Sequence, residues 1–332
     1  MQKKTVLSGI RPTGKLHLGN YFGALENFVK IQNDYECYFF VADWHALTTG
    51  YNETDNIVEN VNEMIYDWLS VGLNPDNCAI FLQSSIKQHA ELHLLFSMVT
   101  PLSWLMRCPT YKDMMTQLKD KDLATYGFLG YPCLQAADIL IYNADFVPVG
   151  EDQLPHLELT REIARRFNFI YGDVFKEPQP LLTKAKVLLG TDGRKMSKSY
   201  NNTIMISENP DEVKKKVMSM VTDPSRIRKD DPGHPDICSV FLFHKIFSPD
   251  ELPEIESDCK AGKIGCVQCK RNLAEKLCSY MSPIYQKRCD LAKNKDLPKE
   301  ILLEGYKKAL PKTEETMQSV REAMKLMDLT RS

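Results

Sequence analysis

Two short segments of this sequence combine residue types that suit the binding of a nucleotide. The first, residues 8–20, follows an apolar stretch and reads Ser-Gly-Ile-Arg-Pro-Thr-Gly-Lys-Leu-His-Leu-Gly-Asn. Its glycines let a phosphate approach the backbone, and a helix beginning behind it supplies N–H groups and a positive dipole end. His17 and Asn20, three residues apart, would project from one helix face as neutral donors. The segment has neither a Walker ending nor a Gly-x-Gly-x-x-Gly motif, so an ordinary strand-to-helix turn remains an alternative.

The second segment, residues 190–199, reads Gly-Thr-Asp-Gly-Arg-Lys-Met-Ser-Lys-Ser. It places Lys195 and Lys198 on a loop with two glycines, which predicts a lid that folds onto a triphosphate. Ammonium groups are point charges that stabilise the charge developing on a leaving pyrophosphate. Taken alone, the segment is more typical of a basic surface loop.

The elements that must position these segments follow from the periodicity of apolar residues. Short apolar runs alternate with stretches of helical period, which predicts a doubly wound parallel α/β sheet. In such a sheet, ligands bind beyond the carboxyl ends of the strands at the switch point, and residues 8–20 follow the first strand. The strands are expected over residues 5–10, 38–41, 79–82 and 146–149, and the helices over 18–29, 57–69, 134–141 and 153–167.

Beyond about Tyr200 the pattern indicates helices alone. One is expected to begin at Asn209, with Pro210 in its first turn. Another would follow the capping-box pattern of residues 248–251, and the last would follow Pro311. We therefore expect two domains, an α/β domain over residues 1–200 and an all-helical domain over residues 201–332.

Composition narrows the class of protein. The 332 residues are 43% hydrophobic and 26% charged, with 16 Gly and 18 Pro, which excludes fibrous and low-complexity proteins. No apolar run approaches the ~18 residues of a membrane span, and the first residues lack a signal-peptide core, so a cytoplasmic protein without a membrane partner is expected. The formal net charge is −2, but residues 260–295 carry a net +7. This basic segment is either a phosphate-facing patch or a solvated helix face.

The two segments together resemble the signatures of class I aminoacyl-tRNA synthetases. His-Leu-Gly-Asn at 17–20 resembles the HIGH signature, and Lys-Met-Ser-Lys-Ser at 195–199 matches the KMSKS signature. Three further stretches resemble bacterial tryptophanyl-tRNA synthetases: Ala-Ala-Asp-Ile-Leu at 136–140, Val-Pro-Val-Gly-Glu-Asp-Gln at 147–153 and His-Leu-Glu-Leu-Thr-Arg at 156–161. The resemblance covers essentially the whole α/β part and, more weakly, the helical part.

This resemblance implies a Rossmann-like catalytic domain that activates L-tryptophan with ATP, assisted by Mg²⁺, and passes tryptophan to its tRNA. It also implies a homodimer that binds one tRNA across both subunits, and a helical domain that binds the anticodon. The implied catalytic residues are His17, Asn20, Lys195 and Lys198. The implied ATP site comprises Arg11, Pro12, Thr13, Gly19, Asn20, Gly150, Glu151, Asp152, Val187, Lys195, Met196, Ser197, Lys198 and Ser199.

For the amino-acid pocket, the resemblance implies that Asp138 accepts a hydrogen bond from the indole N–H. Tyr131 and Gln153 would hold the ammonium group, and His45 would line the pocket. Leu7 and Gln135 stand where many tryptophanyl enzymes have Phe and Met, which leaves the lining around the ring open. Taken alone, Asp138 is more typical of a helix-surface or capping aspartate.

Three other functions compete with this interpretation. Tyrosyl-tRNA synthetase shares the fold, but the Val-Pro-Val-Gly-Glu-Asp-Gln stretch argues against it. A cytidylyltransferase-type enzyme also uses a HIGH-like loop, but it would lack the helical domain and the 195–199 signature. A non-catalytic RNA-binding paralogue is disfavoured by the presence of both Lys195 and Lys198.

Cysteines in the helical part form a candidate metal site. Cys259, Cys266 and Cys269 follow a Cys-x6-Cys-x2-Cys pattern, and twenty residues separate Cys238 from Cys259. Four thiolates select Zn²⁺ or an iron–sulfur cluster, and reduced free thiols are the third alternative. The resemblance favours a [4Fe–4S] cluster, because some tryptophanyl-tRNA synthetases carry one in this domain. The stretch His-Ala-Glu-Leu-His at 89–93 does not match a zinc-binding His-Glu-x-x-His motif, so we expect a partly exposed helix there.

Overall fold

The computed structural model describes residues 3–108, 124–182, 188–228 and 230–327, and it contains the predicted parallel sheet. Five strands lie in the order β3-β2-β1-β4-β5, all parallel, which confirms the α/β class. The strand β5 is not predicted by the pattern, because Pro180 interrupts it, and proline is tolerated only at the edge of a sheet. The strands are β1 (Thr5–Ile10), β2 (Glu36–Val41), β3 (Cys78–Leu82), β4 (Phe146–Val149) and β5 (Gln179–Leu182).

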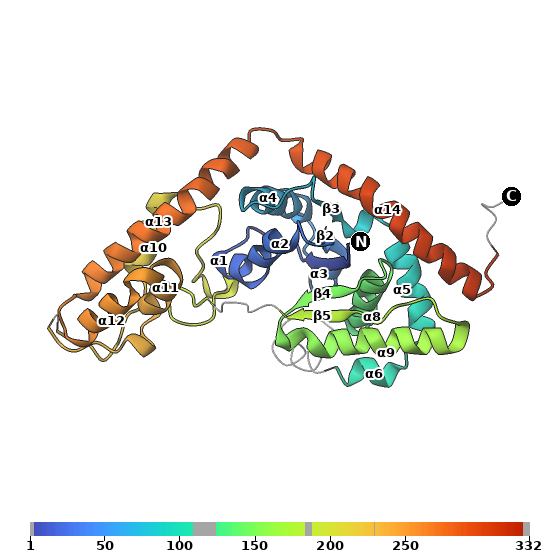
Figure 1. Ribbon diagram of the computed structural model, residues 1–332, viewed down its shortest axis with the longest axis horizontal. Coiled ribbons are helices and arrows are strands. Elements are labelled where there is room, and N and C mark those ends of the chain that lie inside the picture. Colours follow the sequence, from blue (N-terminus) through green and yellow to red (C-terminus); the bar gives the residue numbers. More distant parts are fainter. Residues whose placement is uncertain (1–2, 109–123, 183–187, 229, 328–332) are drawn as a thin grey trace.

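The sheet separates two apolar cores, because successive side chains point to opposite faces. On one face Val6 and Phe39 pack with helices α2 and α4, and on the other Leu7 and Phe40 pack with α5, α8 and α9. Figure 1 shows these helices on either side of the strands. The helices of this part are α1 (Leu18–Asn20), α2 (Glu26–Ile31), α3 (Asp43–Gly50), α4 (Ile57–Ser70), α5 (Gln88–Val99), α6 (Leu102–Met106), α8 (Tyr126–Leu140) and α9 (Leu154–Tyr171).

A third core joins the helical part to both signature segments. Leu18 and Phe22, beside the first segment, and Met196, in the second, are buried against helices α10 to α13. Asn209 caps α10 as predicted, its side chain accepting from the N–H of Glu212 at 2.9 Å. The helices are α10 (Pro210–Ser219), α11 (Ser239–Phe247), α12 (Leu252–Lys260), α13 (Cys266–Leu291) and α14 (Leu297–Ala323).

Two details of the predicted helices are wrong. The Ser248 hydroxyl lies 3.0 Å from Nδ1 of His244 and does not cap a helix, and a 3-10 turn, Pro249–Glu251, precedes α12. The last helix begins at Leu297, and Pro311 lies inside it. A proline removes one helical N–H donor, but Ala309 and Met317 on either side are fully buried and hold the helix on the sheet.

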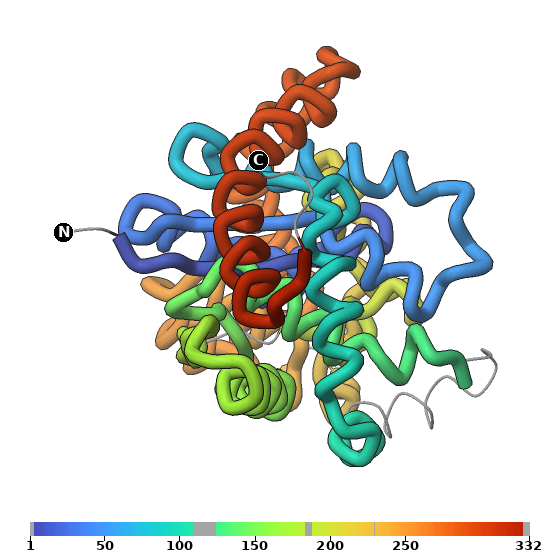
Figure 2. The backbone as a smooth tube through the Cα atoms, turned by 90° about the vertical axis from the view of Figure 1, so that its right-hand side faces the viewer, coloured from blue at the N-terminus to red at the C-terminus, as the bar shows by residue number. Residues whose placement is uncertain are grey.

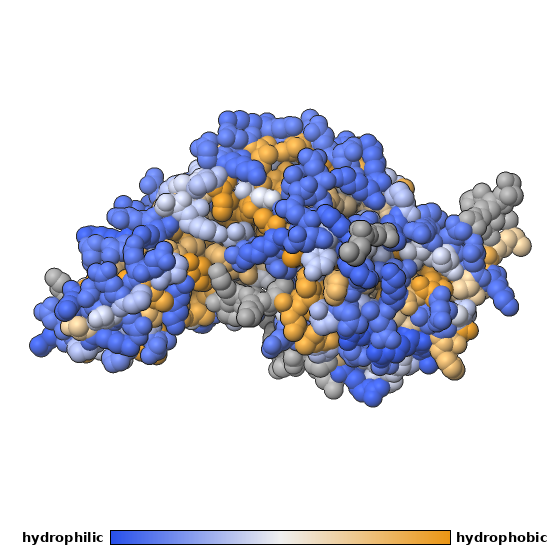
Figure 3. Space-filling view, in the orientation of Figure 1, coloured by the Kyte–Doolittle hydropathy of each residue, from blue (hydrophilic) through white to orange (hydrophobic). Residues whose placement is uncertain are grey.

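The last two long helices meet at an elbow and span the molecule (Figure 1). Helix α13 covers the helical part, whereas α14 returns to lie along the edge strand β3 and beside α5 (Figure 2). The approach of α14 to β3 is close: a Cβ on Gly305 would come within 1.8 Å of the Ile80 carbonyl oxygen. The visible faces of both helices are mostly hydrophilic (Figure 3). Among the described residues, every helix is too short or too polar to cross a bilayer.

Candidate active site

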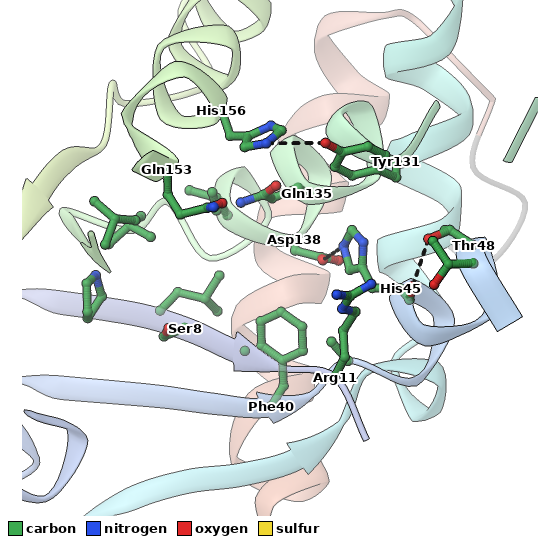
Figure 4. A pocket seen from close by; sticks show the side chains of 18 of the residues that line it. Ser8, Arg11, Phe40, His45, Thr48, Tyr131, Gln135, Asp138, Gln153 and His156 are labelled. Carbon is green, nitrogen blue, oxygen red and sulfur yellow. Dashed lines mark hydrogen bonds and ion pairs between the residues drawn. The ribbon is translucent and has the colours of Figure 1, made fainter. Parts of the chain in front are cut away.

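A pocket of about 360 Å³ lies where the strand order reverses, between the carboxyl ends of β1 and β4. This is the position that open α/β sheets offer to ligands, and the volume suits a small molecule. Phe40, Phe128 and Ile139 give it apolar walls. The six residues expected around the amino acid all line it: Leu7, His45, Tyr131, Gln135, Asp138 and Gln153. Figure 4 shows how these side chains surround the pocket.

Asp138 is a fully buried carboxylate at one end of the pocket, on helix α8. Its Oδ2 lies 2.8 Å from His45 Nε2, its Oδ1 lies 2.6 Å from His89 Nδ1, and Gln83 Nε2 donates to both oxygens at 2.9 Å. Burial alone would raise the pKa of Asp138, but the hydrogen bonds from His45 and His89 outweigh it and hold the pKa at about 2. The group is therefore an ionised acceptor at neutral pH.

Two partners of Asp138, His89 and Gln83, were not among the site residues expected from the sequence. Residues 89–93 lie on the partly exposed helix α5, as expected, but the His89 side chain is on its buried face and contacts Asp138. Gln83 directly follows β3, and its position at the carboxyl end of a parallel strand is a signal that could have found it. No comparable signal marks His89, whose role depends on how α5 packs on α8.

A second buried histidine supports the opposite end of the pocket. His156 Nε2 lies 3.3 Å from the Tyr131 hydroxyl, and its Nδ1 lies 3.7 Å from Cys108 Sγ. Burial lowers the pKa of His156, so its ring is neutral and fit to exchange a hydrogen bond with the phenol. Gln153 enters from the start of α9 next to them (Figure 4). The pocket thus has an anionic end at Asp138 and a neutral polar end at Tyr131.

The first signature segment forms a reciprocal cap at the start of α1. The Asn20 N–H donates to His17 Nδ1 at 3.3 Å, and the His17 N–H donates to Asn20 Oδ1 at 3.1 Å. Burial, and secondarily the charge of Lys198, lowers the pKa of His17 to about 4. The ring is therefore neutral, with Nδ1 as acceptor and the proton on Nε2. A Cβ on Gly19 would meet the His17 ring at 2.9 Å, so this approach requires glycine.

The second signature segment reaches across to the first. Lys198 Nζ donates to the Thr13 carbonyl at 2.9 Å, and Lys195 is exposed on the same loop. The two segments, 170 or more residues apart in the chain, thus lie side by side, and Pro12 is buried. The Ser197 N–H donates to Asn202 Oδ1 at 2.8 Å, which holds the base of the loop.

The remaining residues that were expected to bind the nucleotide lie in three places. Arg11 lines the pocket, and Gly150, Glu151 and Asp152 form the turn after β4, where both carboxylates are exposed. The Met196 side chain is buried in the helical core, so only its backbone faces the loop. Ser199 is exposed, and Val187 lies outside the described residues.

A buried ion pair, which the sequence pattern does not reveal, ties the first segment to helix α13. Asp67 is fully buried; its Oδ2 accepts from the Leu16 N–H at 3.0 Å, and its Oδ1 accepts from Arg288 Nε at 2.6 Å. Arg288 also pairs with Glu63. Neither alternative for the basic segment 260–295, a phosphate-facing patch or a solvated helix face, fits Arg288, whose charge is neutralised inside the protein.

The four candidate metal ligands lie at the ends of α11, α12 and α13. In the described ranges, no group of three or more histidine, cysteine or carboxylate side chains is arranged to hold a metal, so the cluster is not confirmed. The pKa of Cys269 is nevertheless raised to about 12, first by burial and then by the charges of Cys238, Cys259 and Cys266. The thiols thus share one neighbourhood, and thiols are the donor type that iron–sulfur clusters and Zn²⁺ select. The four cysteines therefore offer the type of donor atom that an iron–sulfur cluster or a zinc ion requires.

Comparisons with known proteins agree with this geometry. The family model described as tRNA synthetases class I (W and Y) matches residues 1–281. A tryptophan–tRNA ligase of Aquifex aeolicus is 45% identical, over 97% of this chain and 99% of its own. One of Thermotoga maritima is 48% identical over the same shares. A crystal structure of tryptophanyl-tRNA synthetase from Campylobacter jejuni, complexed with ADP and tryptophan, superposes with a TM-score of 0.88 at 35% identity, covering 97% of this chain and all of that one.

Proposed function

This chain belongs to the class I tryptophanyl-tRNA synthetases, enzymes that join tryptophan to its tRNA, and we propose how its residues divide that work. The observation that carries the assignment is Asp138, an ionised carboxylate at the end of an apolar pocket. It accepts the indole N–H, and phenylalanine is rejected because it would leave this carboxylate unpaired. Tyr131 and Gln153 hold the ammonium group, while Leu7, Gln135 and His45 surround the ring.

The nucleotide binds beside the two signature segments. Arg11, Pro12, Thr13 and Gly19 line the ATP site, and the Gly150, Glu151 and Asp152 turn, with Val187, holds its ribose and adenine. His17 Nε2–H and Asn20 donate to the phosphates. The 195–199 loop closes over them, and Lys198 turns from the Thr13 carbonyl to the phosphate oxygens. This proposal is supported by the short Lys198–Thr13 contact and by the neutral state of His17.

Chemistry at this site requires positioning and charge stabilisation, not a protein nucleophile. The tryptophan carboxylate attacks the α-phosphate of ATP in line, and pyrophosphate leaves towards Lys195 and Lys198, whose charges stabilise it. The adenylate then passes its tryptophanyl group to the terminal ribose of the tRNA. Mg²⁺ would come with the ATP phosphates, since His17 and Lys198 offer nitrogen and Asn20 Oδ1 already accepts the His17 N–H.

The test is ATP–pyrophosphate exchange with tryptophan and tyrosine in parallel. We expect exchange with tryptophan, and Asp138→Asn should weaken it by about 2 kcal/mol, or roughly thirtyfold, while ATP affinity is unchanged. Equal loss of ATP affinity in a nucleotide titration would contradict the role of Asp138. Exchange with tyrosine alone would overturn the assignment.

We further propose that Cys238, Cys259, Cys266 and Cys269 hold a [4Fe–4S] cluster, with Zn²⁺ as the alternative. Their common neighbourhood supports this, and the group would tie α11, α12 and α13 together near the anticodon. Protein purified without oxygen should be brown, with about four irons and four sulfides per chain. One zinc ion per chain would support the four ligands and overturn only the identity of the metal. Colourless protein with neither element would refute the site.

We also propose that the enzyme is a homodimer working in the cytoplasm. Helices α5 and α6 expose large apolar side chains more than half to solvent: Leu94, Met98, Leu102 and Met106. A contiguous apolar face of this kind marks an interaction site. In a dimer, one tRNA would place its acceptor end on one subunit and its anticodon on the other. Light scattering should give twice the chain mass, and a monomeric mass would remove this proposal.

A further inference from the structure

Behind the substrate pocket, a second layer of polar side chains holds Asp138. His89, on α5, and Tyr142, just after α8, are both completely buried and do not line the pocket. His89 Nδ1 lies 2.6 Å from Asp138 Oδ1, and His89 Nε2 lies 3.0 Å from the Tyr142 hydroxyl. The three groups form one continuous chain of hydrogen bonds that ends at the carboxylate.

The direction of each hydrogen bond in this chain follows from chemistry. An ionised carboxylate only accepts, so His89 must donate from Nδ1. With one proton on the ring, carried by Nδ1, Nε2 accepts, and the Tyr142 O–H is its donor. Burial and the charge of Asp138 raise the pKa of Tyr142 well above its usual value, so the phenol keeps its proton. Tyr142 thereby holds the His89 ring from the side opposite Asp138.

The partners of Asp138 also decide which part of the carboxylate meets a ligand. His89 and Gln83 are buried and approach from behind, whereas His45 lines the pocket and is 11% exposed. A carboxylate has about four acceptor positions, and these three side chains engage all of them. An incoming indole N–H therefore takes the position of His45 on Oδ2, while the contacts of His89 and Gln83 remain.

We propose that His89, oriented by Tyr142, is a positioning residue that turns Oδ2 of Asp138 towards the pocket and so sets the preference for a side chain with a ring N–H. The proposal rests on the proposed function, in which Asp138 accepts the indole proton. Neither His89 nor Tyr142 touches the substrate. Their effect reaches tryptophan through the orientation of one carboxylate, which a hydrogen-bonded neighbour on a rigid helix can fix.

The experiment compares tryptophan with an isosteric analogue, 3-(1-benzothiophen-3-yl)alanine, in which sulfur replaces the N–H. Exchange kinetics give kcat/KM for each, and their ratio measures recognition of the N–H. The wild-type enzyme should prefer tryptophan about tenfold to hundredfold, the range of one hydrogen bond to a charged group. In His89→Leu and Tyr142→Phe the ratio should fall towards one, through a raised KM for tryptophan with unchanged values for the analogue and for ATP.

Three variants separate positioning from general stability. His89→Asn keeps a donor near the place of Nδ1 and should restore most of the preference. Tyr66→Phe removes another buried phenol, whose hydroxyl donates to the Asn294 carbonyl, and should leave the ratio at the wild-type value. Tyr142→Phe deletes a single oxygen, so it gives an answer even where His89→Leu does not fold.

The outcomes distinguish this proposal from the function it rests on. Equal losses for both substrates in His89→Leu and Tyr142→Phe, or a retained preference in both variants, would overturn the role of His89 and leave that of Asp138 intact. A wild-type enzyme that accepts both substrates equally would overturn both roles.

Discussion

Burial and hydrogen bonds together set the charge of the side chains that act at this site. Asp138 stays ionised in the protein interior because histidines donate to it, and His17 stays neutral because burial and Lys198 both oppose a proton. The six side chains expected around the amino acid follow from the resemblance to a known family, not from residue types and spacing alone, and all six line the pocket. The resemblance did not lead to Gln83, although its place after β3 is a signal, nor to His89 and Tyr142, which act through contacts between elements that are distant in sequence.

The charge of His17 should depend on Lys198. A proton on His17 lies near the Lys198 ammonium, and like charges repel, so Lys198 lowers the pKa of His17. Replacing Lys198 by Met should therefore raise that pKa above about 4, although burial, the larger cause, keeps it below 6.5. Titration of the His17 ring by NMR between pH 3 and 8 would measure the shift.

Lys195→Met is the matched control for this titration, since Lys195 lies on the same loop and is exposed. It should leave the midpoint of His17 in place. If both variants, or neither, move the midpoint, then the contact between the two signature segments does not control the charge of His17.

At the scale of elements, the first four strands and their helices follow from apolar periodicity, and most bounds agree to within a few residues, but α8 begins at Tyr126, eight residues before the predicted start at 134. Two further exceptions share a cause, which is packing against a distant element. Strand β5 contains Pro180 and forms because β4 pairs with it, and α14 passes through Pro311 because the sheet holds it on both sides of the proline. Local propensity does not contain that information.

The packing of helix α14 against strand β3 should depend on Gly305. An added Cβ would collide with the main chain of Ile80, which cannot move aside as a flexible side chain could. Gly305→Ala should therefore lower the free energy of unfolding by about 2 kcal/mol, the usual cost of overpacking. Denaturant unfolding measures it, with Gly50→Ala as control, since a Cβ on Gly50 meets nothing within 4 Å. Equal stability of the two variants would show that α14 is free to shift.

Across the whole molecule, Arg288 links the two parts. It lies on α13, yet its guanidinium pairs with Asp67, which in turn accepts the Leu16 N–H beside His17. Burial raises the pKa of Asp67, and the charge and hydrogen bond of Arg288 lower it, so the ionised state of this carboxylate depends on Arg288. Removing one member of a buried ion pair leaves the other as an unpaired charge in the interior. Arg288→Met should therefore lower the free energy of unfolding by about 3 kcal/mol.

A matched variant tests this link on the same helix. Arg271→Met, at an exposed position of α13, should change the free energy of unfolding by less than about 0.5 kcal/mol. If Arg288→Met is as mild as Arg271→Met, the pair does not hold the two parts together.

The exposed remainder of the basic segment should bind tRNA. Lys270 reaches the Met218 carbonyl and Lys276 pairs with Glu251, whereas Arg271 is exposed. Arg271→Met should weaken tRNA binding and reduce the slope of log K against log salt by about 1, because one phosphate contact is lost. Pyrophosphate exchange should be unaffected. Lys30→Met on α2 is the control, and an unchanged slope for Arg271→Met would remove this residue from the interface.

The return of α14 to strand β3 has a consequence for how the chain folds while it is being synthesised. A ribosome makes the chain from its amino end, so the edge of β3 stays open until residues 297–323 have emerged. An open strand edge offers its N–H and C=O groups to other chains. A nascent polypeptide that stops before residue 297 would thus carry both signature segments with the edge of β3 uncovered, and this part of the fold would form only after residues 297–323 have been made.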